Sequence, residues 1–230
     1  MLVRVKKYFK TSRDLNSGQK IEDKIRCSEI LGVAATGLGK FIFMDYLNWR
    51  LQYVCVAILA WTIYVFYRYK KNKNVIKDWG FRLDNFVSTL KLMMPFAIFS
   101  VITIFIVGLL QGSINFTWHF IQILISYPIW GSIQQFLTIG LLAGNLSNMK
   151  SVKLKRFSII LITAIFFSIV HFPSIWLMIG TFILALYYGF IYLKSKNLYA
   201  LGLLHGWLGA LFYYTVLNQD PFSEIFLKYF

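Results

Sequence analysis

The chain has 230 residues, which suits one domain or two small ones. Hydrophobic residues make up 58% of it and charged residues only 14%, whereas a water-soluble globule carries about 25% charged residues. A net charge of +15 would suit nucleic acid in a soluble protein, but here the basic residues stand in short blocks between long apolar runs. That pattern orients proteins in a bilayer. We therefore predict an all-α, polytopic membrane helical bundle without a nucleic-acid partner.

Seven apolar segments are long enough, or nearly so, to cross a hydrocarbon core of about 30 Å, which takes about 20 helical residues. The first contains Lys40 and Asp45 and is the weakest, because it could instead lie in the membrane interface. The predicted spans are Ile30–Leu47, Leu51–Tyr67, Leu92–Leu110, Trp118–Gly144, Phe157–His171, Ser174–Leu193 and Leu198–Leu217.

Lys and Arg in short loops mark the cytoplasmic side of a membrane protein. If the N-terminus is cytoplasmic and all seven segments span, nearly all of the 24 basic residues fall in inside loops. Omitting the first span would put the N-terminal cluster on the wrong side. We therefore predict a basic cytoplasmic tail (1–29), two transmembrane helices with a basic loop (30–76), the remaining spans (77–217) and a short C-terminal tail (218–230).

Polar side chains at bilayer depth are costly and are candidate functional residues. Gln134 and Gln135 are adjacent on the fourth span, His171 ends the fifth, and His205 lies in the seventh. A rise of about 1.5 Å per residue places these groups in the same half of the bilayer. The alternative is that they form interhelical hydrogen bonds, worth about 0.6 kcal/mol on average. His119, next to a tryptophan at a span boundary, is interpreted as an interfacial anchor.

Small residues gather on the same two helices. Such faces allow helices to approach closely, and close packing would bring Gln134 and His205 within reach of each other. The small residues are Gly131, Ser132 and Gly140 on the fourth span, and Gly202, Gly206, Gly209 and Ala210 on the seventh.

Three of these segments resemble the motifs of the CPBP intramembrane proteases, named for CAAX proteases and bacteriocin-processing or immunity (Abi) proteins. Their Glu-Glu-x-x-x-Arg, Phe-x-x-x-His and His-x-x-x-Asn motifs are matched in order by Gln134–Ile139, Phe167–His171 and His205–Gly209. Asp78–Phe81, just before the third span, is similar to the approach segment that many members carry. The resemblance implies an all-helical protease core over 77–217.

The departures from the family pattern bear on catalysis. In the family, the first motif's Glu is implied to activate water with the second motif's His, while the last motif's His and Asn stabilise the oxyanion. Here Gln134 and Gln135 replace both carboxylates, Ile139 replaces the Arg and Gly209 the Asn. His171 and His205 remain as presumptive catalytic residues, and Phe167 supports them.

An amide cannot accept a proton, so neither Gln can act as a general base. His171 could take that role, with Gln134 orienting a water and His205 donating to the oxyanion. Two His without a carboxylate are one ligand short of the usual catalytic zinc set, so zinc is disfavoured and we predict no cofactor.

Three hypotheses remain open: an intramembrane endopeptidase with degenerate motifs; a pseudoprotease acting as scaffold, maturation partner or immunity factor; and a transporter or channel subunit that uses the His pair as a proton relay. The missing carboxylates favour an inactive or altered enzyme. Expected partners are membrane lipid and either a membrane-proximal or lipidated peptide or another membrane protein. Loops rich in Lys, Asn and Ile suggest a bacterial inner or plasma membrane.

Overall fold

The computed structural model describes the backbone of residues 12–224 and the side chains of residues 19–224. Helices and connecting loops make up this part of the chain, and no strand occurs in it, as predicted. The helices, in chain order, are α1 (Ser12–Gly39), η1 (Lys40–Tyr46, a π-helix), α2 (Arg50–Lys71), α3 (Val75–Trp79), α4 (Phe86–Gln111), α5 (His119–Gln135), η2 (Phe136–Ala143, a π-helix), α6 (Gly144–Asn148), α7 (Arg156–Ile169), α8 (Ile175–Ser195) and α9 (Leu198–Thr215).

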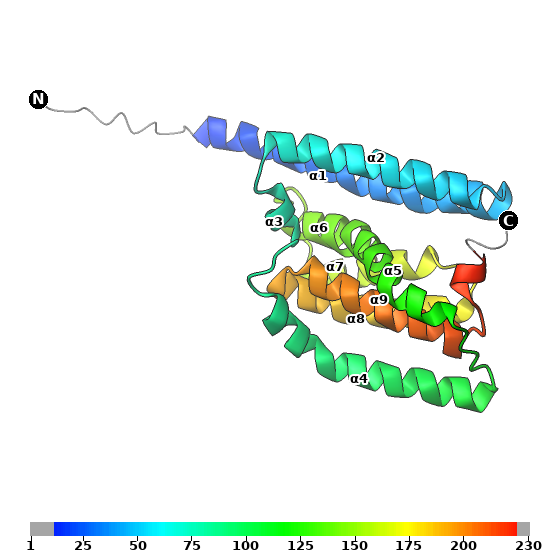
Figure 1. The fold of residues 1–230 in the computed structure, drawn as a ribbon. Coiled ribbons are helices and arrows are strands. Elements are labelled where there is room, and N and C mark those ends of the chain that lie inside the picture. The colour runs from blue at the N-terminus through cyan, green and yellow to red at the C-terminus, as the bar shows by residue number, and fades with distance from the viewer. Residues whose placement is uncertain (1–11, 225–230) are drawn as a thin grey trace, which may run out of the picture.

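The helices run roughly parallel or antiparallel to one another in a layered bundle (Figure 1). The α1–α2 hairpin covers one side of the bundle and α4 lies on the opposite side, with α5, α7, α8 and α9 between them. Within this middle layer, α5 packs most extensively on α9, and α7 on α8. The candidate residues of α5, α7 and α9 therefore all belong to the interior layer.

The predicted number of about seven spans is not confirmed. Among the described residues, four helical segments are long and apolar enough to cross a membrane: Gln19–Tyr46, Arg50–Lys71, Phe86–Gln111 and Ile175–Ser195. With 14 residues, α7 is too short, whereas α5 is long enough only together with η2 and α6, into which it continues without a break. The last predicted span, α9, is long enough, but His205 and three glycines lower its mean hydropathy, and it is not among the four candidates.

The first apolar segment is part of one long helix. α1 begins at Ser12, well before the predicted span, and continues directly into η1. Lys40 and Asp45, the two charges that argued against spanning, form an ion pair of 2.7 Å. Pairing lowers the cost of placing charges in an apolar segment. Residues 1–11 of the predicted N-terminal tail and 225–230 of the predicted C-terminal tail lie outside the described residues.

A polar cluster attaches the N-terminal hairpin to the bundle. The Glu29 carboxylate on α1 is buried and accepts hydrogen bonds from Tyr64 (2.6 Å) and Arg68 of α2, and from Asn145 of α6 (2.7 Å). A buried charge is tolerated when it is paired and fully hydrogen-bonded. This cluster fixes α1 and α2 relative to α6.

Asp78–Phe81, the segment matched to the family's approach region, is anchored at the start of α9. Gly80 has φ of +105°, and a Cβ there would lie 2.9 Å from the carbonyl oxygen of Lys196. Its own carbonyl accepts from Leu198 N–H at 2.7 Å, and the Tyr192 hydroxyl donates to the Trp79 carbonyl. The left-handed conformation and the close approach together require glycine at position 80.

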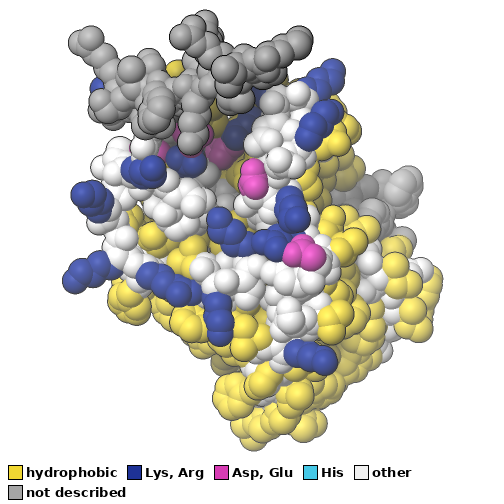
Figure 2. Space-filling model, turned by 90° about the vertical axis from the view of Figure 1, so that its left-hand side faces the viewer, with side chains coloured by type: hydrophobic (Ala, Val, Ile, Leu, Met, Phe, Trp, Pro, Cys, Tyr) yellow, Lys and Arg dark blue, Asp and Glu magenta, His cyan; other side chains and the backbone are white. Residues whose placement is uncertain are grey.

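Exposed basic side chains gather at one end of the bundle. Figure 2 shows this end, with Lys and Arg over the helix termini and hydrophobic side chains beyond them. The charges come from the end of α2, from α3, from the first turns of α4, from the α6–α7 loop and from the end of α8. They include Lys70, Lys71, Lys73, Lys77, Lys91, Lys150, Lys153, Lys155, Arg156 and Lys194.

His119 is not the interfacial anchor that its position beside Trp118 suggested. Its ring is buried, with Nδ1 2.6 Å from the carboxylate of Asp220, which follows α9. Tyr214 and Thr117 donate to the same carboxylate. The cluster joins the start of α5 to the segment after α9, a contact between residues about a hundred positions apart that no local pattern could reveal.

Candidate functional site

The crossing of α5 and α9 depends on small residues. A Cβ on Gly131 would lie 2.6 Å from the carbonyl oxygen of Gly202, and one on Gly206 only 2.4 Å from the backbone of Pro128. The two backbones are thus in contact at two positions about one turn apart. The prediction that small residues bring these helices together is confirmed.

This close crossing places Gln134 of α5 against His205 of α9. The Nε2 atom of His205 lies 2.8 Å from Oε1 of Gln134. An amide oxygen only accepts, so Nε2 carries the proton and donates, which leaves a lone pair on Nδ1. This Nδ1 is buried and has no hydrogen-bond partner among the described residues. His205 is therefore held as a neutral imidazole in one tautomer.

His171 approaches the same region from the end of α7. Its Nδ1 lies 2.7 Å from the carbonyl oxygen of Phe167, one turn earlier, so Nδ1 donates and Nε2 has a free lone pair. The Phe167 ring is buried, with centroid distances of 4.9 Å to His171 and 5.5 Å to His205. Phe167 thus orients one imidazole through its carbonyl and packs against both through its ring.

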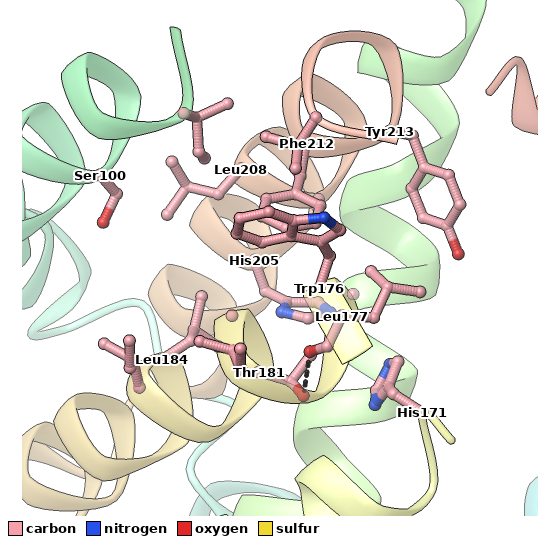
Figure 3. A pocket seen from close by; sticks show the side chains of 18 of the residues that line it. Ser100, His171, Trp176, Leu177, Thr181, Leu184, His205, Leu208, Phe212 and Tyr213 are labelled. Carbon is pink, nitrogen blue, oxygen red and sulfur yellow. Dashed lines mark hydrogen bonds between the residues drawn. The ribbon is translucent and has the colours of Figure 1, made fainter. Parts of the chain in front are cut away.

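Gln134, His171 and His205 line one cavity of about 260 Å³ between α4, α5, α8 and α9. Figure 3 shows the two imidazoles among the apolar and aromatic side chains that surround this space. The walls include Phe99, Tyr127, Trp176, Leu184, Leu208 and Phe212. The cavity is thus apolar over most of its surface, with a small polar region at one side.

Two of the candidate residues lie apart from the cavity. The side chain of Gln135 is 0% exposed, and neither its oxygen nor its nitrogen has a hydrogen-bond partner among the described residues. Ile139 is also fully buried, in the core around η2. Neither Gln135 nor Ile139 is among the residues that line the cavity. The amide of Gln134 therefore faces the cavity, whereas the amide of Gln135 lies in the core.

Gly209 lies on the cavity wall, four residues after His205. A Cβ at this position would meet only Cδ1 of Tyr127, at 3.9 Å. The place where the family motif carries Asn is therefore open, and a side chain could enter it without displacing backbone.

A family model described as type II CAAX prenyl endopeptidase Rce1-like matches residues 41–211. The chain belongs to this family. The resemblance to CPBP proteases is thereby confirmed, and the apolar helices fit the integral membrane protein that membership implies. No curated protein and no solved structure gave a significant match.

The donor groups of the site limit its chemistry. The cavity-lining residues offer two imidazoles, one amide and several hydroxyls, and they include no carboxylate. Across the described residues, no three His, Cys, Asp or Glu side chains are grouped as metal ligands would be. The proton acceptors of the site are therefore uncharged imidazole nitrogens, Nε2 of His171 and Nδ1 of His205.

The sequence alone did not indicate all the residues around the site. Trp176 and Tyr127 face the cavity, but aromatic residues are so frequent in this chain that neither stood out. Lys40 contacts the loop that carries His171, with Nζ 2.6 Å from the Phe172 carbonyl oxygen. Its place within an apolar segment was a signal, which the sequence could not connect to a contact 132 residues away.

Proposed function

We propose that this chain is a family member with degenerate motifs that binds a membrane-proximal peptide carrying a lipid or other apolar tail, and that hydrolysis is lost or greatly reduced. The observation that carries the proposal is the cavity itself. Its apolar walls suit a hydrocarbon tail, and its polar side can hydrogen-bond a peptide group.

The shape and the hydrogen bond of Gln134 support a protein that has lost hydrolysis but has kept the pocket. Gln and Glu have nearly the same shape, and the Gln134 oxygen accepts from His205 as a carboxylate oxygen would. The substitution therefore preserves packing and the hydrogen bond while removing the base, because an amide cannot take a proton from water. A pocket that persists without its base suits a scaffold, maturation partner or immunity factor.

A second candidate function, slow peptide hydrolysis, is favoured by His171. Its Nε2 lone pair is free, since Nδ1 is engaged by the Phe167 carbonyl. With a water between His171 and Gln134, this imidazole would act as the general base and His205 would donate to the oxyanion. General-base catalysis by a His contributes about 10²–10⁴-fold, enough for weak turnover.

We further propose that the N-terminus is cytoplasmic and that the protein resides in a bacterial inner or plasma membrane, in contact with lipid. The basic end of the bundle supports this orientation, since cytoplasmic loops are enriched in Lys and Arg. In a chain with Cys27 and Cys55 replaced by Ser, Asn148→Cys tests it. The new thiol should react with an impermeant reagent only from the cytoplasmic face, and labelling from outside would contradict the orientation.

The decisive experiment for function uses the purified full chain in liposomes and a fluorescent farnesylated peptide, with the plain peptide as reference. Gly209→Leu fills the cavity, whereas Val56→Leu, on an exposed face of α2, is the matched control. We expect binding of the farnesylated peptide that Gly209→Leu weakens at least tenfold and Val56→Leu leaves unchanged. Equal binding by both variants would contradict the proposal.

The same samples separate binding from hydrolysis. Mass spectrometry of the peptides after incubation shows any cleavage, and His171→Ala identifies its source. Cleavage that disappears in His171→Ala would establish the second candidate function. Binding without cleavage in either protein would establish the first.

A further inference from the structure

The turn that carries His171 contacts the N-terminal helix. Lys40 is the first residue of η1, and its Nζ lies 2.6 Å from the carbonyl oxygen of Phe172, the residue directly after His171. The same Nζ lies 2.7 Å from the carboxylate of Asp45. The Lys40 ammonium thus contacts both the Asp45 carboxylate on η1 and the backbone of the turn that carries His171.

The surrounding packing makes this contact a close one. A Cβ on Gly37, one turn before Lys40, would lie 2.9 Å from the Phe166 ring and 3.1 Å from Val170. The end of α1 therefore touches the end of α7 just where the chain turns towards His171. The Phe172 side chain is 55% exposed and gives the turn little anchorage of its own.

The π-helical form of η1 suits the pairing of Lys40 with Asp45. A π-helix has i→i+5 hydrogen bonds, so residues five apart are neighbours along its surface. Asp45 is five residues after Lys40 and can therefore reach the ammonium while Lys40 extends towards Phe172. The Asp45 carboxylate balances the positive charge of Lys40, and the Lys40 ammonium still has an N–H group to donate to the Phe172 carbonyl.

We propose that Lys40 is a positioning residue for His171. By binding the Phe172 carbonyl it fixes the turn in which the His171 imidazole faces the cavity. The inference rests on the proposed role of His171 in that cavity. Lys40 precedes the segment that matches the family model, residues 41–211, so the contact comes from a part of the chain outside the family's motifs.

Selective ¹⁵N-histidine labelling tests this, because the chain has only three His residues. The full chain is placed in lipid nanodiscs, and the imidazole signals are assigned with His119→Gln, His171→Gln and His205→Gln. We expect Lys40→Met to shift or broaden the His171 signals and to leave those of His119 unchanged. Lys40→Arg, which keeps charge and donors, should restore the wild-type His171 signals.

Two further variants complete the design. Lys91→Met, on an exposed part of α4, is the matched control and should leave all three imidazoles unchanged. Asp45→Asn is a milder change that stays informative if Lys40→Met fails to fold, and it should shift His171 to a smaller extent. Unchanged His171 signals in folded Lys40→Met, or in Asp45→Asn if Lys40→Met does not fold, would overturn the inference.

The measurement needs no peptide and no turnover. A failure of the proposed peptide binding would therefore leave the NMR result interpretable, and unchanged His171 signals would refute only the role of Lys40. Peptide binding by Lys40→Met can then be measured separately with the farnesylated probe, where we expect a loss of affinity that Lys40→Arg restores.

Discussion

Nε2 of His205 on α9 donates to Oε1 of Gln134 on α5 at 2.8 Å. The partners stand 71 residues apart in the chain, and they meet because Gly131 and Gly206 let the two backbones touch. The bond fixes the tautomer of His205 and holds the Gln134 oxygen at the cavity wall. It also holds in place the Gln134 amide, which stands where the family motif has the carboxylate that acts as the base.

Gln134→Glu should restore a general base at that position. The carboxylate would accept the same bond from His205, now charge-assisted and stronger, and could take a proton from a water in the cavity. We expect cleavage of the farnesylated peptide to rise about 10²–10⁴-fold over the wild-type rate. Mass spectrometry of the peptide in liposomes measures this.

Gln135→Glu is the matched control for that experiment. Its side chain is fully buried and has no partner among the described residues, so a carboxylate there would be buried without compensation. We expect lower thermal stability and no gain in cleavage. A folded Gln134→Glu protein without any gain, also when combined with Gly209→Asn, would contradict the inferred geometry.

Gly206 and Gly209, two of the three glycines on α9, should respond oppositely to alanine. Gly206→Ala places a Cβ 2.4 Å from the Pro128 backbone, and such overpacking costs about 1–3 kcal/mol or more. Gly209→Ala meets only Tyr127 at 3.9 Å and should stabilise by up to about 1 kcal/mol, because Ala is the better helix former. Thermal unfolding in detergent compares them, and equal effects would show that the α5–α9 crossing is wrong.

Much of this arrangement could be predicted from sequence. Apolar runs between basic blocks indicated membrane helices, and the small residues indicated the α5–α9 contact, because both depend on local composition. The small residues on both helices also indicated that Gln134 and His205 lie within reach of each other. The sequence could not show which way each side chain points. Gln134 faces the cavity, whereas Gln135, its neighbour, points into the core.

Contacts between distant segments were the other limit. Lys40 argued against a first span until its partners, Asp45 and the Phe172 carbonyl, were known. His119 resembled an anchor at a membrane boundary because its partner, Asp220, lies after the last helix. The predicted number of spans stays unconfirmed for a related reason: helices inside a bundle can be shorter, as α7 is, or less hydrophobic, as α9 is, than helices that face lipid.

Gln135→Met should be neutral or stabilising. The Gln135 amide lacks a hydrogen-bond partner among the described residues, and an unsatisfied buried polar group costs about 1–3 kcal/mol. Met has a similar volume and no such requirement. Gln134→Met, which removes the partner of His205, is the contrast and should destabilise. Thermal unfolding of both variants checks this, and destabilisation by Gln135→Met would indicate that its amide is hydrogen-bonded.

Asp220 should make a pH-dependent contribution to stability. Burial raises the pKa of this carboxyl, but the hydrogen bonds from Tyr214, His119 and Thr117 outweigh burial and hold its pKa well below the usual 3.8. Because the folded pKa lies below the unfolded one, the stabilisation is present above about pH 4 and is lost as the pH falls through the folded value.

Asp220→Asn tests this directly. The variant keeps the size of the side chain but loses the charge that attracts these donors, so we expect it to unfold at a lower temperature than the wild type at pH 5. The difference should shrink as the pH falls from 5 towards 2, because Asp220 of the unfolded wild-type chain then takes up a proton and the stabilisation that comes from the lowered folded pKa is lost progressively. A difference that stays constant over that range would show that the pKa of Asp220 is not depressed, and that the segment after α9 is held by packing, such as the contact of Phe222 with the His119 ring.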